Sequence, residues 1–127
     1  MRRADQRRAA VVALYQQDVT GRPLEELVPR ASRAFTRELI AGVDAEREQL
    51  DVLIERHAVD WPLDRIAPLE RNILRVALFE LHHRADVPDE VAIDEAIEAA
   101  KELCSVDAPG FVNGILGAAE RARVAAP

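Results

Sequence analysis

Arginines followed by a tyrosine make the first helical stretch the segment best suited to binding chemistry. Arg2, Arg3, Arg7 and Arg8 lie within eight residues, and Tyr15 follows Arg8 by seven. In a helix this spacing puts Arg8 and Tyr15 on one face, about 10 Å apart along the axis. Such a pair suits an arginine contact to an RNA phosphate and stacking of the tyrosine on a base. The alternative fits the composition equally well: Tyr15 packs in the core and the arginines are only solvated.

The run that opens the last helix is the second candidate region, Ala108-Pro-Gly-Phe-Val-Asn-Gly-Ile-Leu116. Asp107 stands directly before it and is a suitable N-cap residue. Gly114 and Gly117 lie about 60° apart around a helix. Because glycine destabilises helices, we expect that another helix backbone approaches them closely. No Gly-Lys-Ser/Thr sequence follows, so this run is not a phosphate-binding P-loop.

The segment 68–84 carries an aromatic residue within its polar face. Phe79 projects among polar side chains that include Arg71, Arg75 and His82. An aromatic side chain surrounded by arginines is typical of a surface that binds another protein. The alternative is that a neighbouring helix of the same chain covers Phe79.

Two glutamates fall inside the apolar arc of that segment. Glu70 lies in its first turn, where the helix dipole favours negative charge. Glu80 lies deeper and is expected to pair with an arginine from another helix. The two are nearly three turns apart, too far for one acid–base centre. Adjacent histidines, His82 and His83, diverge by about 100° around the helix and lack a further ligand at suitable spacing. We therefore expect no catalysis, metal or cofactor.

Length and composition indicate one globular domain over residues 1–127. The chain is 49% hydrophobic and 31% charged, but only 4% aromatic, which favours closely packed helices. No apolar run approaches the roughly 18–20 residues that span a bilayer. The N-terminus also lacks the apolar core of a signal peptide, so we expect a cytoplasmic protein. The single cysteine, Cys104, excludes an internal disulfide and is expected to be an unreactive structural thiol.

The charge of the chain is distributed unevenly. Its net charge is −6, but the first eight residues hold four arginines and one aspartate, a charge of +3 that leaves −9 for the remainder. Most of the surface therefore repels phosphate. Any RNA contact is expected to be local and anchored near the N-terminus.

Every periodic segment has the helical period. The predicted helices cover 3–19, 23–28, 31–57 as one rod or two helices, 68–84, 89–104 and the stretch after Asp107. The first has an apolar side made of Val11, Val12, Leu14, Tyr15 and Val19. Trp61, in the connector before Pro68, is expected to be a buried anchor. The fold class is therefore all-α, a compact bundle of six or seven helices.

Six short segments, taken in order and spacing, resemble the NusB family of bacterial transcription antitermination factors across nearly the whole chain. They are Arg7-Arg-Ala-Ala-Val-Val-Ala-Leu-Tyr15, Glu38-Leu-Ile-Ala-Gly-Val43, Leu69-Glu-Arg-Asn-Ile-Leu-Arg-Val-Ala-Leu-Phe-Glu-Leu81, Asp86-Val-Pro88, Ile93-Asp-Glu-Ala-Ile97 and Phe111-Val-Asn-Gly-Ile-Leu116. The resemblance implies two helical subdomains. It also implies binding to the boxA element of nascent ribosomal RNA transcripts as a heterodimer with NusE, a small-subunit ribosomal protein. Other Nus factors and RNA polymerase are implied as further partners. The resemblance implies no reaction and no cofactor.

The resemblance also implies roles for single residues. The residues that match the RNA surface are Arg3, Arg7, Tyr15, Glu70, Asp107 and Phe111, to which the charge pattern adds Arg2 and Arg8. The residues that match the NusE-facing side are Glu70, Arg71, Arg75 and Phe79. Asp5 and Gly110 depart from the family pattern and weaken the positive charge, so RNA binding is expected to depend on the partner. Two other readings remain: a homodimer of the free protein, or the accessory domain of an RNA cytosine methyltransferase.

Overall fold

The computed structural model describes residues 2–126, and within that range every regular element is a helix. The elements are α1 (Arg3–Thr20), α2 (Leu24–Leu27), α3 (Ala34–His57), the short 3-10 helix η1 (Leu63–Arg65), α4 (Pro68–His83), α5 (Asp89–Leu103) and α6 (Ala108–Ala125). This confirms the all-α prediction. The stretch predicted as one rod or two helices is the single helix α3.

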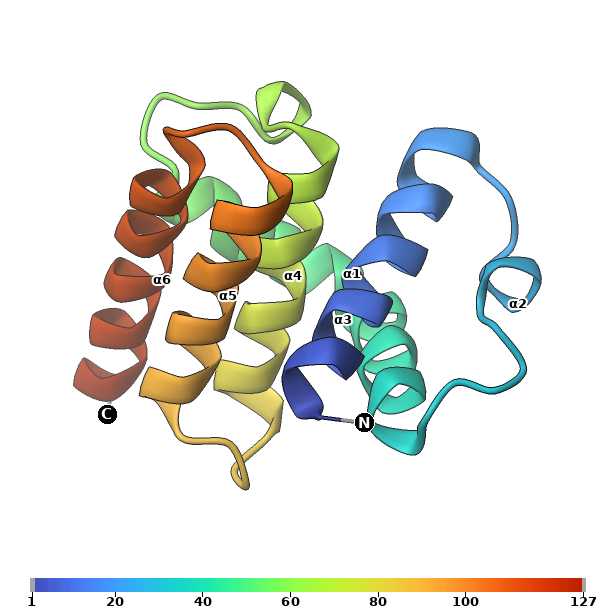
Figure 1. Cartoon of the computed structure of the whole chain (residues 1–127). Helices are drawn as coiled ribbons and strands as arrows, with labels where there is room; N and C mark the ends of the chain where they lie inside the picture. Colours follow the sequence, from blue (N-terminus) through green and yellow to red (C-terminus); the bar gives the residue numbers. More distant parts are fainter. Residues whose placement is uncertain (1, 127) are drawn as a thin grey trace.

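The helices form two groups that share one core. Figure 1 shows α1 and α2 on one side and α4, α5 and α6 on the other, while α3 runs behind α4 from the first group toward the second. Helix α4 lies between the groups and packs against α1, α3, α5 and α6. Nine of its 16 residues are buried, among them Leu74 and Leu78. This agrees with the wide apolar arc of its sequence, which is typical of a central helix.

Proline and glycine set several of the helix ends. Gly21 ends α1 in the left-handed region, with φ of 72°, and its N–H donates to the carbonyl of Gln17 at 2.8 Å. A side chain would strain this conformation, whereas glycine adopts it freely. Pro68 starts α4 in the first turn, where its missing N–H costs nothing. Pro88 directly precedes α5.

Some predicted core positions are wrong. Val12 and Val19 are exposed, although Val11 and Leu14 on the same helix are buried. Trp61, predicted as a buried anchor, is 50% exposed. Each of these side chains reaches beyond the area that the neighbouring helices cover. None of the helices within residues 2–126 is long and apolar enough to cross a membrane.

The close packing predicted at the glycines of α6 occurs at a glycine of α3 instead. A Cβ at Gly114 would meet no atom of the described chain within 4 Å, and one at Gly117 would meet only the Arg121 side chain. The predicted helix–helix groove on α6 is therefore wrong. The close approach occurs at Gly42 of α3 instead. A Cβ there would lie 2.1 Å from Cζ of Phe79, because the phenyl ring occupies that space.

Phe79 accordingly packs between helices and does not stand on an open polar face. Its ring lies over Gly42 and stacks on His83, with ring centroids 5.2 Å apart. Of the two interpretations of Phe79, the structure confirms that a neighbouring helix of the same chain covers it, because α3 passes directly over that position.

We expect Gly42→Ala to destabilise the fold by about 1–3 kcal/mol, because the new methyl group displaces the Phe79 ring. Alanine normally stabilises a helix interior relative to glycine by roughly 0.5–1 kcal/mol. Gly114→Ala, in open space on α6, is the matched control and is expected to be stabilising. Urea unfolding of both variants, of Phe79→Ala and of the double variant Gly42→Ala with Phe79→Ala measures how strongly positions 42 and 79 are coupled in the free energy of unfolding. Equal effects of the two glycine substitutions would show that the ring moves aside without cost.

Candidate functional site

A pocket of about 300 Å³ lies at the end of the molecule drawn uppermost in Figure 1, where η1 and the segments that open α4 and α6 meet. We call it the apical pocket. It is lined by Trp61, Glu70, Ser105, Asp107, Ala108 and Phe111. The fold thus brings together three residues that the sequence predicted for RNA binding: Glu70, Asp107 and Phe111. Sequence reasoning missed Trp61 here because it treated that residue as core.

Two aromatic rings form one corner of the apical pocket. The ring centroids of Trp61 and Phe111 are 6.4 Å apart, and their planes meet at 64°. This edge-to-face arrangement is the one that aromatic quadrupoles favour. It leaves Trp61 half exposed while Phe111 is half-buried against the core.

Two carboxylates face the same pocket without a partner. Neither Glu70 nor Asp107 has a hydrogen bond or ion pair with any side chain in residues 2–126. Burial raises the pKa of Glu70. Asp107 occupies the predicted N-cap position, but its backbone is helical and its side chain makes no capping bond to the described chain. The pocket therefore presents hydrogen-bond acceptors beside aromatic rings.

Cys104 lies close to this pocket but is not activated. Burial, followed by the negative charge of Glu70, raises the pKa of its thiol to about 11. A thiol with such a pKa stays protonated at neutral pH and is a poor nucleophile, as the sequence predicted.

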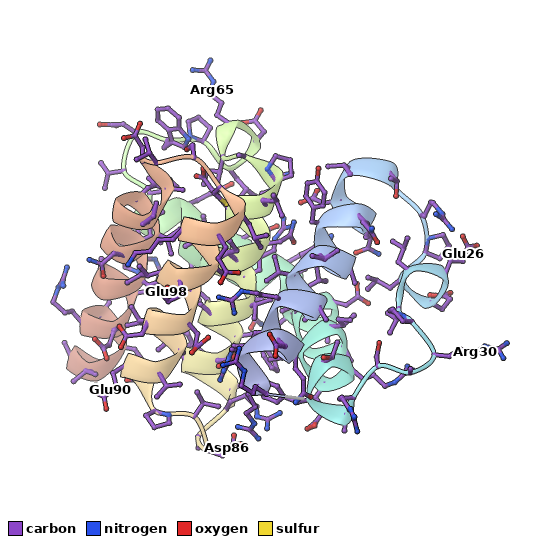
Figure 2. The ribbon with its side chains drawn as sticks, in the orientation of Figure 1. Glu26, Arg30, Arg65, Asp86, Glu90 and Glu98 are labelled. Atoms are coloured by element: carbon purple, nitrogen blue, oxygen red, sulfur yellow. The ribbon has the colours of Figure 1, made fainter. Side chains whose placement is uncertain are left out.

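The N-terminal arginines lie at the opposite end of α1 from the apical pocket (Figure 1). Each described one has an acidic partner: Arg2 pairs with Asp5 at 3.5 Å, and Arg3 pairs at 3.4 Å with Asp86, which Figure 2 labels in the turn between α4 and α5. Arg3 also lies 4.2 Å from the ring centroid of Phe35. These exposed pairs are weak in water, so their arginines remain available to a phosphate.

Arg8 faces α5 instead of projecting freely. Its Nε lies 2.6 Å from Oε2 of Glu102, and its Nη1 lies 3.8 Å from Glu95. Tyr15 is half-buried two turns further along α1. The Arg8 end of the expected shared face thus borders α5.

Arg7 is not a surface residue. It is 8% exposed and donates two hydrogen bonds to Glu80, which is 1% exposed, at 2.7 and 3.0 Å. This confirms that Glu80 pairs with an arginine from another helix. Arg7 therefore does not project from the surface, because α1 turns that side chain toward α4, and its role in RNA binding stays a prediction.

Two of the residues predicted for partner binding belong to an interior polar network. Arg75, 4% exposed, donates to Asp51 at 2.7 and 3.1 Å and to Asp18 at 3.0 Å. Arg71 donates to the same Asp18 oxygen at 3.0 Å. The prediction that Arg75 lies on an open face is wrong, since α1 and α3 cover it.

Asp18 is the centre of this network, and sequence reasoning missed it. Burial alone would raise its pKa, but hydrogen bonds from Arg71 and Asn72 and the charge of Arg75 outweigh that effect, and the pKa is lowered. A signal was present in the sequence: Asp18 lies in the last turn of α1, where the helix dipole disfavours an acid. A carboxylate at such a place indicates a cationic partner elsewhere in the fold.

The network also holds the loop that carries Trp61. Besides Asp18, the Arg71 guanidinium donates to the carbonyls of Leu63 and Ile66 at 3.3 and 3.2 Å. The connector before α4 is thereby tied to α1, which orders one wall of the apical pocket.

Comparison with known proteins gives a consistent picture. The NusB family model matches residues 4–121. The transcription antitermination protein NusB of Rubrobacter xylanophilus is 44% identical over 127 residues, which cover 94% of this chain and 91% of that protein. Among solved structures, T. maritima NusB superposes with a TM-score of 0.88 at 33% identity, covering 95% of this chain and 92% of that one. A crystal structure of antitermination factors NusB and NusE in complex with dsRNA matches with a TM-score of 0.83 at 25% identity, over 96% and 99% of the chains.

A family match over most of the chain, a close full-length relative and the same arrangement of helices agree with one another, and so this chain belongs to the NusB family of transcription antitermination proteins.

Proposed function

We propose that this chain binds boxA RNA of nascent ribosomal RNA transcripts as a heterodimer with NusE, and that it acts in the cytoplasm within an antitermination complex with other Nus factors on RNA polymerase. The observation that carries the proposal is the apical pocket, where an aromatic corner stands beside two unpartnered carboxylates. Single-stranded RNA is recognised by stacking of splayed bases on aromatic rings and by hydrogen bonds to their edges. The related structure that contains NusB, NusE and dsRNA supports the choice of partners.

The rest of the binding surface follows from the charges. Arg2, Arg3 and Arg8 supply phosphate contacts, and Tyr15 and the apical pocket supply base contacts. The intramolecular acids on these arginines compete with phosphate, so affinity of the free protein is low and NusE increases it. Arg7 acts through the fold, by holding α1 against Glu80.

The NusE contact is centred on the start of α4. Of the four residues assigned to this side, Arg71 and Arg75 have buried partners and Phe79 packs over Gly42. Glu70 alone among the four lacks a partner within the described chain. It is therefore the residue of this group that is free to bind NusE as well as RNA.

The direct test is RNA binding with and without NusE, comparing a boxA oligonucleotide with a scrambled one of the same composition. We expect tighter binding of boxA and a further gain in affinity on adding NusE. Equal affinities for both RNAs in the presence of NusE would contradict the proposal.

Charge substitutions at the N-terminus test the phosphate contacts. Arg3→Ala combined with Arg8→Ala is expected to weaken boxA binding and to reduce the slope of log K against log salt by about 0.7 per lost contact. Arg30→Ala is the matched control, because Arg30 projects from the loop between α2 and α3, away from this surface (Figure 2). Fluorescence anisotropy across a salt series measures both. An unchanged slope in the double variant would remove Arg3 and Arg8 from the interface.

A further inference from the structure

The apical pocket also has features that distinguish one base from another. We propose that it takes one unpaired guanine of the RNA, which stacks on Trp61 and donates its Watson–Crick edge to the carboxylate of Glu70. The proposal rests on the RNA-binding function proposed above. It adds a stacking residue and a base preference.

The aromatic corner sets the orientation of the base. Because the planes of Trp61 and Phe111 meet at 64°, a flat ring that lies on one of them meets the other at its edge. Trp61 has the more exposed face, since half of its surface is open while Phe111 packs partly on the core. The base therefore stacks on the indole, and Phe111 closes the side. Stacking of a base on an aromatic side chain is sequence-tolerant, so it supplies affinity without selecting the base.

Trp61 is held in place before RNA arrives. The backbone N–H of Trp61 donates to the carbonyl of Ala58 at 3.0 Å, and the left-handed backbone of Asp60, with φ of 61°, turns the chain out of α3. Further along the loop, the buried Ile66 anchors the backbone, and Arg71 binds its carbonyl. A loop that is ordered before binding loses little conformational freedom when the base stacks on Trp61.

Glu70 supplies the selective contact. Its carboxylate lines the pocket, is half-buried, and has no hydrogen-bond or ion-pair partner in the described chain. Most other half-buried or buried carboxylates here, such as Asp18, Asp51 and Glu80, are paired with arginine. Partial loss of hydration raises the Glu70 pKa, so the group gains more from a new donor than an exposed carboxylate does. A ligand that offers donors satisfies this acceptor.

Guanine is the base whose edge fits a carboxylate. Its N1–H and N2–H groups are adjacent donors that match the two oxygens of one carboxylate. Adenine and cytosine offer an amino donor beside an acceptor nitrogen, and uracil offers one N–H between two carbonyls. Each of these brings an acceptor lone pair against the negative charge. A bidentate pair of this kind discriminates between bases.

A positive charge is available for the phosphate of this nucleotide. Arg65, on the same loop as Trp61, projects outward from this end of the molecule (Figure 2), and its guanidinium has no hydrogen-bond or ion-pair partner within residues 2–126. It offsets the repulsion between RNA and the two pocket carboxylates.

The single tryptophan of the chain makes the proposal directly measurable. The probes are four uridine dodecamers: one unmodified, and three with a central guanosine, inosine or adenosine. Inosine keeps N1–H and lacks the N2 amino group. We expect the guanosine RNA to quench Trp61 fluorescence and to bind at least fivefold more tightly than the inosine or adenosine RNA by anisotropy.

Variants separate the two contacts. Glu70→Gln is expected to abolish the preference for guanosine over inosine while binding of the uridine RNA is retained. Glu90→Gln, an exposed carboxylate near the start of α5 and far from the pocket (Figure 2), is the control and is expected to keep the preference for guanosine. Trp61→Leu is expected to lower affinity for all four RNAs, because stacking does not select the base, with thermal melting checked for each variant.

Equal affinities for the guanosine, inosine and adenosine RNAs would overturn the proposal, as would a preference that survives Glu70→Gln. Either result could coexist with intact boxA and NusE binding, which would leave the proposed function standing. Loss of boxA selectivity in the presence of NusE would instead remove the proposed function itself.

Discussion

Glu80→Ala is expected to lower the free energy of unfolding by about 3–5 kcal/mol, because it leaves the buried Arg7 guanidinium without its carboxylate. The pair is the most enclosed ion pair between α1 and α4, with Arg7 8% and Glu80 1% exposed. Domains of this size have stabilities of roughly 5–15 kcal/mol, so the variant loses a large share of its stability.

Urea unfolding at neutral pH measures this effect. Glu90→Ala, an exposed glutamate near the start of α5 (Figure 2), is the matched control and is expected to change stability by less than about 0.5 kcal/mol. Replacing both partners, Arg7→Met with Glu80→Leu, is expected to cost much less than Glu80→Ala because no charge is left buried. If Glu80→Ala and Glu90→Ala lowered the free energy of unfolding by the same small amount, Arg7 would have to reach solvent without cost.

The double variant also decides the role of Arg7 in RNA binding. If Arg7 acts through the fold alone, the double variant keeps its affinity for RNA under conditions in which it is folded. A loss of affinity comparable to that of Arg3→Ala with Arg8→Ala would place Arg7 at the interface after all.

Asp18→Ala is expected to have the second largest effect, about 2–3 kcal/mol, because one carboxylate oxygen serves Arg71, Asn72 and Arg75. Hydrogen bonds to charged groups are worth more than neutral ones, and three donors lose their acceptor together. Since Arg71 also holds the loop of Trp61, RNA binding at the apical pocket is expected to weaken in parallel.

Acid titration of stability provides an independent check on Asp18. Its pKa is lowered from the ordinary value of 3.8, so its contribution is complete above about pH 4 and is lost as the pH falls through the lower folded-state pKa. The isosteric Asp18→Asn variant lacks this contribution, and the two stability curves are expected to converge below pH 4. Thermal melting between pH 2 and 7 measures both. A constant difference across that range would mean that the pKa of Asp18 is the same in the folded and unfolded protein.

Part of the candidate site could be predicted from the sequence. Glu70, Asp107 and Phe111 were assigned through the family resemblance, and the structure places them around one pocket. Trp61 was misjudged because a lone tryptophan in an apolar connector looks the same whether its ring faces the core or solvent. Asp18 was missed because its three partners on α4 are more than 50 residues away in sequence.

The sequence by itself determined the helices and their ends, because these depend on local properties. Apolar residues at the helical period, Gly21 and the prolines act on the backbone within a few residues. It also required a cation for Glu80, since a charge in an apolar arc needs a partner in any all-helical fold.

Only the tertiary structure decided what each side chain meets. Arg7 and Arg8 are adjacent and chemically identical. Arg7 nevertheless forms a buried ion pair with Glu80, whereas Arg8 pairs with Glu102 on α5. Gly42 and Gly114 are both helical, yet one lies under a phenyl ring and the other is open. Neighbouring positions on a helix point about 100° apart. Their environments therefore depend on how each helix is rotated about its own axis, and packing against distant helices sets that rotation.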